Sequence, residues 1–205
     1  MASTDSAERS GKLSRARILE IALDHFAIHG YRGSSLARIA AEVGISQAGL
    51  LHHFPNKAAL LQAVLVQRDV RDLEEAETDP ERLTDMDLDE VLAFLVRIVR
   101  HNAENRNLVQ LAHLTAAEAA GADHPAHAWV VGRLEFLRSM VEAAVTRSID
   151  AGTVRADVDA RTVTNLVIAA SEGLENQWLL DGGVDIVGSF ASFADGLRRA
   201  VATTD

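Results

Sequence analysis

Apolar residues along the chain recur mostly at spacings of three and four positions, which is the period of a helix packed on one face. Alanine is abundant and β-branched residues rarely alternate with polar ones, which disfavours strands. The pattern therefore predicts an all-α protein. We expect nine helices, over residues 14–29, 36–43, 47–53, 57–78, 87–103, 105–120, 124–151, 159–181 and 184–203.

Residues 36–53, LARIAAEVGISQAGLLHH, predict two short helices joined by a tight turn. Ser34 or Ser35 is placed to cap the first helix, Gly44 to end it and Ser46 to open the second. This is the sequence form of a helix-turn-helix, although an ordinary helical hairpin gives the same pattern. The expected exposed positions of the second helix carry small, apolar and hydrogen-bonding side chains that fit a DNA major groove: Gln47, Ala48, Gly49, Leu51, His52 and His53.

The formal net charge of −10 over 205 residues argues, taken whole, against a nucleic-acid partner. The charge is unevenly distributed, however. Residues 1–57 hold seven basic and five acidic side chains, a balance of +2, and the remainder holds −12. Such asymmetry favours contact between the first part and a polyanion, but chance variation in composition explains so small an excess equally well.

Several classes of function are disfavoured. The chain has no cysteine, which excludes disulfides, thiol nucleophiles and cysteine-ligated metals. Its histidines lack the spacing of a zinc site, and phosphate-binding loops and nucleophile elbows are missing, so we expect no metal, no cofactor and no enzymatic activity. No apolar run is long enough to span a bilayer, and the first ten residues lack the apolar core of a signal peptide. We expect a cytoplasmic protein without a membrane partner.

The segment from Phe26 to Leu65 resembles the DNA-binding domain of the TetR (tetracycline-repressor-like) family. The shared features have fixed spacings: Gly30-Tyr31, the serine pair, Ile39-Ala40, Gly44, Ser46, His53-Phe54, Lys57 and Leu60-Leu61. The resemblance covers residues of about 12–65.

This resemblance implies a repressor that binds a palindromic double-stranded DNA operator as a homodimer and is released by a small-molecule inducer. It divides the chain into a helix-turn-helix DNA-binding domain, 1–57, with an arm at 1–12, and a ligand-binding and dimerisation domain, 58–205. The architecture is then a nine-helix, two-domain regulator with a three-helix head. Small residues in 159–181 and 184–203 would let these helices pair closely across the dimer.

For the DNA-binding residues, the family pattern gives Lys57 a phosphate contact. The amide of Gln47 can pair with adenine, although an uninvolved surface glutamine is equally compatible. Leu51 stands where the family usually has a tyrosine, so it either contacts a thymine methyl or sugar, or weakens operator binding. The predicted DNA contacts are Ser34, Ser35, Arg38, Ser46, Gln47, Ala48, Gly49, Leu51, His52 and Lys57.

The ligand side depends on the middle helices, whose apolar stripes fit either a pocket or a packed core. Arg133 interrupts such a stripe and either binds an anionic ligand or pairs with Glu118 or Glu172. The alternative to a regulator is a small all-helical enzyme or ligand carrier without DNA binding. The predicted pocket residues are Phe94, Ile98, His113, Trp129, Arg133, Phe136, Met140, Glu172 and Asn176.

Overall fold

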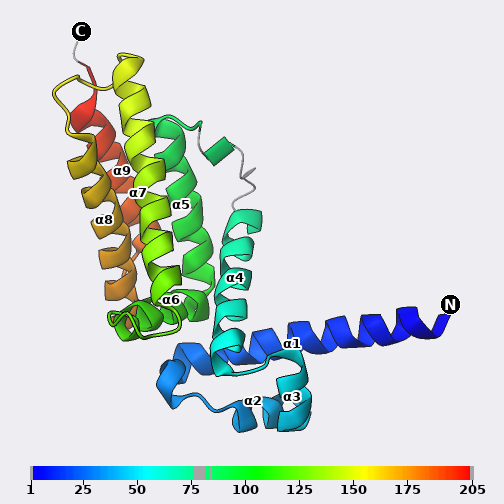
Figure 1. Cartoon of the computed structure of the whole chain (residues 1–205). Coiled ribbons are helices and arrows are strands. Elements are labelled where there is room, and N and C mark those ends of the chain that lie inside the picture. Colours follow the sequence, from blue (N-terminus) through cyan, green and yellow to red (C-terminus); the bar gives the residue numbers. More distant parts are fainter. Residues whose placement is uncertain (1, 76–81, 84, 204–205) are drawn as a thin grey trace. The chain divides into compact units, whose positions relative to one another are not determined.

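The computed structural model describes residues 2–75, 82–83 and 85–203, with the side chains of residues 2–14, 72 and 75 left out. Within these ranges the protein has nine α-helices and no strand, as predicted (Figure 1). The helices are α1 (Ala2–Gly33), α2 (Leu36–Val43), α3 (Gln47–His53), α4 (Lys57–Glu75), α5 (Leu88–Glu104), α6 (Arg106–Glu118), α7 (His127–Asp150), α8 (Ala160–Leu180) and α9 (Ile186–Val201).

Helix α1 differs most from the prediction, because it begins at Ala2 and not at residue 14. The segment expected to form an arm, 1–12, has no proline and a single glycine, so nothing in it stops the helix from extending. At the other end, Gly30 has φ 67° and ψ −179°, which breaks the helix at the residue where the sequence predicted its end. All other bounds lie within three residues of prediction.

The described chain forms two compact units. The head unit contains the residues up to Asp69 together with Gln110–Val130, and the body unit contains Val70–Val109 and Val131–Asp205. This division differs from the predicted one after Lys57. Leu60 and Leu61 of α4 are fully buried and continue the apolar core of the helix-turn-helix, so the packing does not end at a loop.

The core of the head unit is formed where three short apolar stripes meet. Ile18 and Phe26 of α1, Ile39 of α2 and Leu50 of α3 are each at most 1% exposed. Gly44 ends α2 in the left-handed conformation, with φ 86°, and its N–H donates to the carbonyls of the last turn. The turn and these contacts set the angle between α2 and α3.

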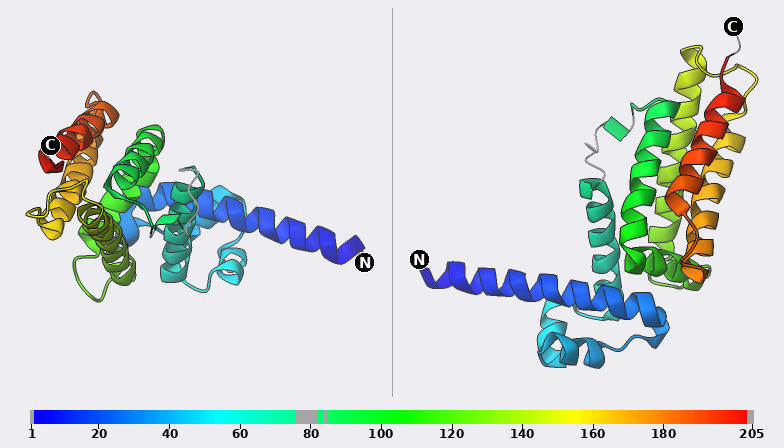
Figure 2. Two further views of the ribbon diagram at one scale, coloured as in Figure 1. Left: turned by 90° about the horizontal axis from the view of Figure 1, so that it is seen from above. Right: turned by 180° about the vertical axis from the view of Figure 1, so that it is seen from behind.

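Helices α5, α7, α8 and α9 lie side by side in the body unit (Figures 1 and 2). Their apolar faces form one continuous core, in which Leu92, Val141, Val167 and Phe190 are at most 1% exposed. Burial of such side chains is worth about 1.5–3 kcal/mol each, so this core supplies most of the body's stability.

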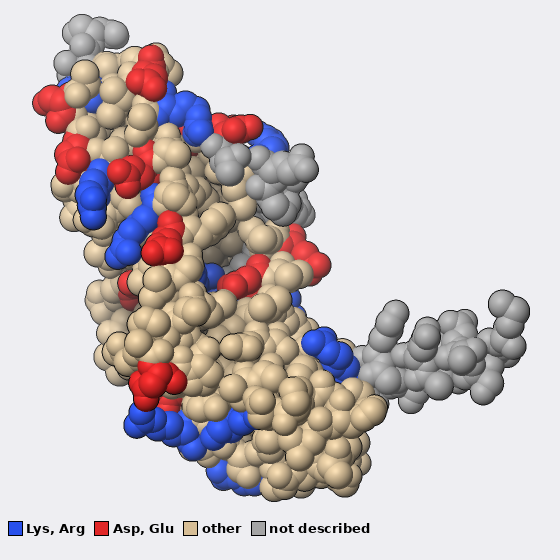
Figure 3. Space-filling view, in the orientation of Figure 1, with Lys and Arg blue, Asp and Glu red and all other residues tan. Residues whose placement is uncertain are grey.

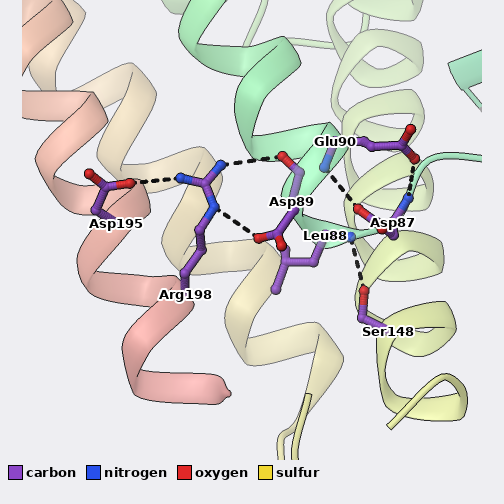
Figure 4. A network of polar contacts seen from close by, with 7 residues as sticks. All are labelled: Asp87, Leu88, Asp89, Glu90, Ser148, Asp195 and Arg198. Carbon is purple, nitrogen blue, oxygen red and sulfur yellow. Dashed lines mark hydrogen bonds and ion pairs between the residues drawn. The ribbon is translucent and has the colours of Figure 1, made fainter. Parts of the chain in front are cut away.

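Polar contacts tie the start of α5 to the ends of α7 and α9 (Figure 4). Asp87 and Glu90 form a capping box at the start of α5, and the N–H of Leu88 donates to Ser148 Oγ of α7 over 2.9 Å. Arg198 of α9 donates to Asp89 Oδ1 over 2.9 Å. These contacts fix the end of the helical bundle at which α5 begins.

Candidate nucleic-acid interface

Helix α3 presents an uncharged face to solvent. Ser46 caps it, because its Oγ accepts the N–H of Gly49 over 3.0 Å. Leu50 is fully buried and anchors the helix, whereas Gln47, Ala48 and His52 are exposed and Leu51 is 37% exposed. The structure therefore brings four of the predicted base-facing residues onto one accessible face, while Gly49 is half-buried.

Two cationic side chains among the predicted DNA contacts lie in the same unit as α3. Figure 3 shows no acidic side chain over α3 in that view, and Lys and Arg side chains around the lower end of the same unit. Arg38 Nη2 donates to the carbonyl of Gly33 over 2.8 Å. Lys57 Nζ donates to the carbonyl of Ser34 over 3.0 Å and lies 4.5 Å from the centre of the Tyr31 ring. The two cations among the predicted DNA contacts are thus held against the turn between α1 and α2.

The serine pair fulfils the predicted capping role only in part. Ser34 is 4% exposed, and its hydroxyl donates to the carbonyls of Gly30 and His25 over 2.7 and 3.0 Å. Ser35 is the N-cap of α2 by backbone conformation, but its side chain makes no capping hydrogen bond. In this structure Ser34 holds the turn together and does not offer its hydroxyl to solvent.

Glu118 was considered from the sequence only as a partner of Arg133, but in the structure it contacts this turn from far along the chain. Its Oε2 accepts the N–H of Tyr31 over 2.7 Å and its Oε1 accepts the N–H of Arg32 over 3.5 Å. His124 packs edge-on against the Tyr31 ring, with ring centres 5.1 Å apart. Only the glycine at position 30 carries a local signal of the unusual backbone that makes these contacts possible.

The predicted ligand-pocket residues do not gather in one place. Phe94 and Met140 are buried in the body core with Ile98 packed against it, and Arg133 is half-buried. Phe136, Glu172 and Asn176 are exposed. His113 and Trp129 belong to the head unit, where the Trp129 indole N–H donates to Asp69 Oδ2 over 2.7 Å.

A buried polar pair that the sequence did not single out lies in the body. Asn102 Nδ2 of α5 donates to Glu175 Oε1 of α8 over 2.6 Å, and the two residues are 2% and 9% exposed. Asn102 Oδ1 is buried without a hydrogen-bond partner. A carboxylate can only accept hydrogen bonds, so the Asn102 amide nitrogen, which donates, must face Glu175, and the amide oxygen must point elsewhere.

Two further properties bear on partners. Among the helices that the structure describes, none is both long and apolar enough to cross a membrane. Within the same residues, no three or more histidine and carboxylate side chains are grouped so that they could hold a metal ion.

A short helix, a left-handed glycine turn and a second short helix with an exposed face define the helix-turn-helix class of DNA-binding proteins. The family described as bacterial regulatory proteins, tetR family, matches residues 18–64. UidR, a helix-turn-helix transcriptional regulator of Escherichia coli K12, is 26% identical over 200 residues, which covers 96% of this chain and 95% of UidR. RutR of the same organism is 45% identical over 64 residues, 28% of this chain and 30% of RutR. Residues 18–64 therefore carry the DNA-binding domain of the TetR family, and the chain as a whole is similar to its transcriptional regulators.

Solved structures share the fold along nearly the whole chain. A TetR regulator from Chloroflexus aurantiacus gives a TM-score of 0.78 at 22% identity, covering 96% of this chain and 100% of that one. A complex of triclosan with SmeT, a repressor from Stenotrophomonas maltophilia, gives a TM-score of 0.76 at 20% identity, covering 93% of this chain and 92% of SmeT. FadR of Bacillus subtilis in complex with stearoyl-CoA gives a TM-score of 0.72 at 20% identity, covering 91% of this chain and 98% of FadR. These similarities establish the all-α fold with its N-terminal helix-turn-helix.

Proposed function

We propose that this regulator is a repressor that binds a palindromic operator as a homodimer and leaves it when a small molecule binds the body unit. The observation that carries the proposal is the exposed face of α3, with Gln47, Ala48 and Leu51 side by side and no Asp, Glu, Lys or Arg in the helix. A dimer presents two such faces, which matches a two-fold symmetric DNA site.

We expect α3 to recognise A·T base pairs. The Gln47 amide offers the donor and acceptor that adenine presents in the major groove, and the methyl groups of Ala48 and Leu51 suit the thymine methyl. The aliphatic Leu51 has no hydroxyl to donate to a phosphate. We therefore expect Arg38, Ser46 and Lys57 to make the contacts with the DNA phosphate backbone. Residues that touch bases set sequence preference, whereas residues that touch phosphates set affinity for all sequences.

The test begins with DNA duplexes selected from a random-sequence library by the purified protein. Gln47→Ala should lower the difference in binding free energy between the preferred base pair and the others at one position by about 1–3 kcal/mol. Arg38→Ala should weaken binding to all sequences alike, and should lower by about 1 the slope of the logarithm of the binding constant against the logarithm of the salt concentration. Gln62→Ala, at an exposed glutamine of α4, is the matched control. If Gln47→Ala and Arg38→Ala act alike, the division between base and phosphate contacts is wrong.

The dimer interface is proposed on α8 and α9. Leu166 and Leu180 of α8 are 52% and 83% exposed, and Ala169 and Gly173 between them are exposed too. Their spacing of three, four and seven positions places them on one side of the helix. Small residues allow two helices to approach closely, and exposed leucines gain from burial against a second copy.

Sedimentation velocity tests this interface. Leu166→Lys should convert a dimer to a monomer and should weaken binding to the selected duplex. Val131→Lys changes an apolar residue of α7 that is 38% exposed and should leave the dimer intact. A monomer from Val131→Lys together with a dimer from Leu166→Lys would place the interface elsewhere.

The ligand response is proposed from the structural relatives that were crystallised with triclosan and stearoyl-CoA. In the body, Asn102 Oδ1 leaves a buried acceptor open beside the Glu175 carboxylate, which is the polar feature best placed to orient a ligand donor. A compound that raises the melting temperature should also release the selected duplex. Glu175→Gln should reduce both effects, and Glu172→Gln, at an exposed carboxylate of the same helix, should change neither.

A further inference from the structure

The turn after α1 has a backbone conformation that is matched to a carboxylate. Gly30 has φ 67° and ψ −179°, a region that only glycine adopts without strain. A Cβ at this position would lie 2.7 Å from Glu118 Oε1. The glycine therefore serves two purposes, since it permits the backbone bend and leaves room for the Glu118 side chain.

The bend directs two successive N–H groups, those of Tyr31 and Arg32, at the same carboxylate. Consecutive backbone N–H groups arranged in this way form an anion-binding concavity. Glu118 fills it, with its shorter hydrogen bond at 2.7 Å, in the range of charge-assisted contacts. The carboxylate thus holds the turn in place from a position 87 residues further along the chain.

The same turn anchors the residues that are expected to meet DNA. Ser34 donates its hydroxyl to the carbonyl of Gly30, and Lys57 donates to the carbonyl of Ser34. Lys57 also lies over the Tyr31 ring, and Arg38 donates to the carbonyl of Gly33. Movement of this turn would therefore shift both cations and the start of α2 together.

We propose that Glu118 is a positioning residue for operator binding: its carboxylate holds the turn at residues 30–34 so that Lys57, Arg38 and α2 are placed for DNA. Glu118 belongs to the segment 110–130, both ends of which continue into the body unit. A ligand in the body that withdraws this carboxylate would release the turn. This second role rests on the proposed ligand response, whereas the positioning role needs only DNA binding.

Replacement of Glu118 removes a negative charge and also removes the hydrogen bonds that hold the turn, and these two losses should change the affinity for operator DNA in opposite directions. Removal of a negative charge from a DNA-binding unit strengthens binding to any duplex, because phosphate repulsion falls. Loss of the positioning contact weakens binding to the operator alone. The direction of the change in specific affinity therefore separates the two effects.

The experiment compares wild type, Glu118→Ala and Glu118→Gln on two probes, a duplex selected by the wild-type protein and an unrelated duplex of equal length. Glu118→Ala should lose about tenfold or more in affinity for the selected duplex, the equivalent of one charged hydrogen bond. Glu118→Gln keeps a neutral acceptor and should lose less. Both variants should bind the unrelated duplex as well as wild type or better.

Asp123→Asn is the matched control, since it removes an exposed carboxylate from the same unit. It should bind both probes as tightly as wild type or more tightly. Hydrogen exchange should accelerate at the amides of Tyr31 and Arg32 in Glu118→Ala only. An unchanged melting temperature should accompany these results.

Unchanged or tighter specific binding by Glu118→Ala would overturn the inference. So would a parallel loss on both probes with a lower melting temperature, because that result means a general loss of fold. Failure of the wild-type protein to select any sequence refutes the proposed operator binding and the inference together. The first two outcomes leave operator binding by the wild-type protein intact.

Discussion

Three helix starts in the body and the bend near the end of α1 in the head are held in different ways. In the body, Asp87, Asp159 and Asp185 each accept the backbone N–H three residues further on. In the head, the turn after α1 is held by Glu118, which contacts Tyr31 from 87 positions away. A local cap forms wherever its helix forms, whereas the Glu118 contact requires a distant segment to be in place. The bend at Gly30 therefore depends on a segment that is distant in the chain, whereas the three aspartate caps do not.

This difference suits a regulator. A cap formed by neighbouring residues is worth about 0.5–2 kcal/mol and stabilises one helix. A contact between distant segments links the conformation of one to the other, so a change in one alters the other. The four predictions that follow would break or sharpen the comparison between the two units.

The largest effect is expected in the body core. Phe190 is fully buried, so Phe190→Ala should cost about 3–5 kcal/mol of unfolding free energy, measured by urea denaturation. Because the segment 110–130 lies between two body segments in the chain, DNA binding should be lost with the fold. Phe193→Ala, at a half-buried neighbour, should cost less. Full DNA binding by an unfolded body would show that the head needs no distant support.

The next effect is expected at the turn in the head. Gly30→Ala combines a backbone strain of about 1–3 kcal/mol with a clash against Glu118, so specific DNA affinity should fall sharply. The double variant Gly30→Ala, Glu118→Ala removes the clash and keeps the strain, and should show less than the sum of the two losses. Gly33→Ala lacks both problems and serves as the control. Strict additivity would mean that Gly30 and Glu118 act independently.

A smaller effect is expected at a local cap. Asp87→Ala should cost about 0.5–2 kcal/mol of stability by removing the capping box of α5, with no change in DNA affinity. Asp89→Ala breaks an exposed ion pair with Arg198 and should cost about 0.2–1 kcal/mol. Thermal unfolding and gel-shift titration measure the two quantities separately. A loss of DNA affinity in Asp87→Ala would contradict the local character of the cap.

The smallest effect depends on pH. Hydrogen bonds from the side chain and backbone of Thr162 lower the pKa of Asp159 from its ordinary value of 3.8. Since the folded pKa is the lower one, the stabilisation is present above the unfolded value and is lost as pH falls through the folded pKa. The melting-temperature advantage of wild type over Asp159→Asn should therefore shrink between about pH 5 and about pH 2. An advantage that grows on acidification would contradict this sign.

The sequence predicted best what neighbouring residues determine. Gly44, Ser46 and Leu50 mark the turn, cap and anchor of the helix-turn-helix, and the structure places them in those roles. The inward hydroxyl of Ser34 depends on the bend at Gly30, four residues earlier. The contact of Glu118 joins segments that meet only after folding, so no local pattern reveals it.

The body shows a second limit of sequence interpretation. Glu172 and Asn176 were expected to face a ligand, but both are exposed, and Glu175 between them is buried. Adjacent residues on a helix point about 100° apart, so a small error in helix orientation exchanges inner and outer faces. Polar residues give no hydrophobic signal to correct such an error, which is why the Asn102–Glu175 pair was missed.

The two tryptophans of the chain lie in different units. Trp129, in the head unit, donates its indole N–H to Asp69, and Trp178, in the body unit, lies 5.0 Å below the guanidinium of Arg106. The protein therefore carries one tryptophan in each unit, in a different polar environment. Trp129→Phe and Trp178→Phe each leave a single tryptophan, so selective excitation of tryptophan can follow the order in which the two units lose their structure without any attached label.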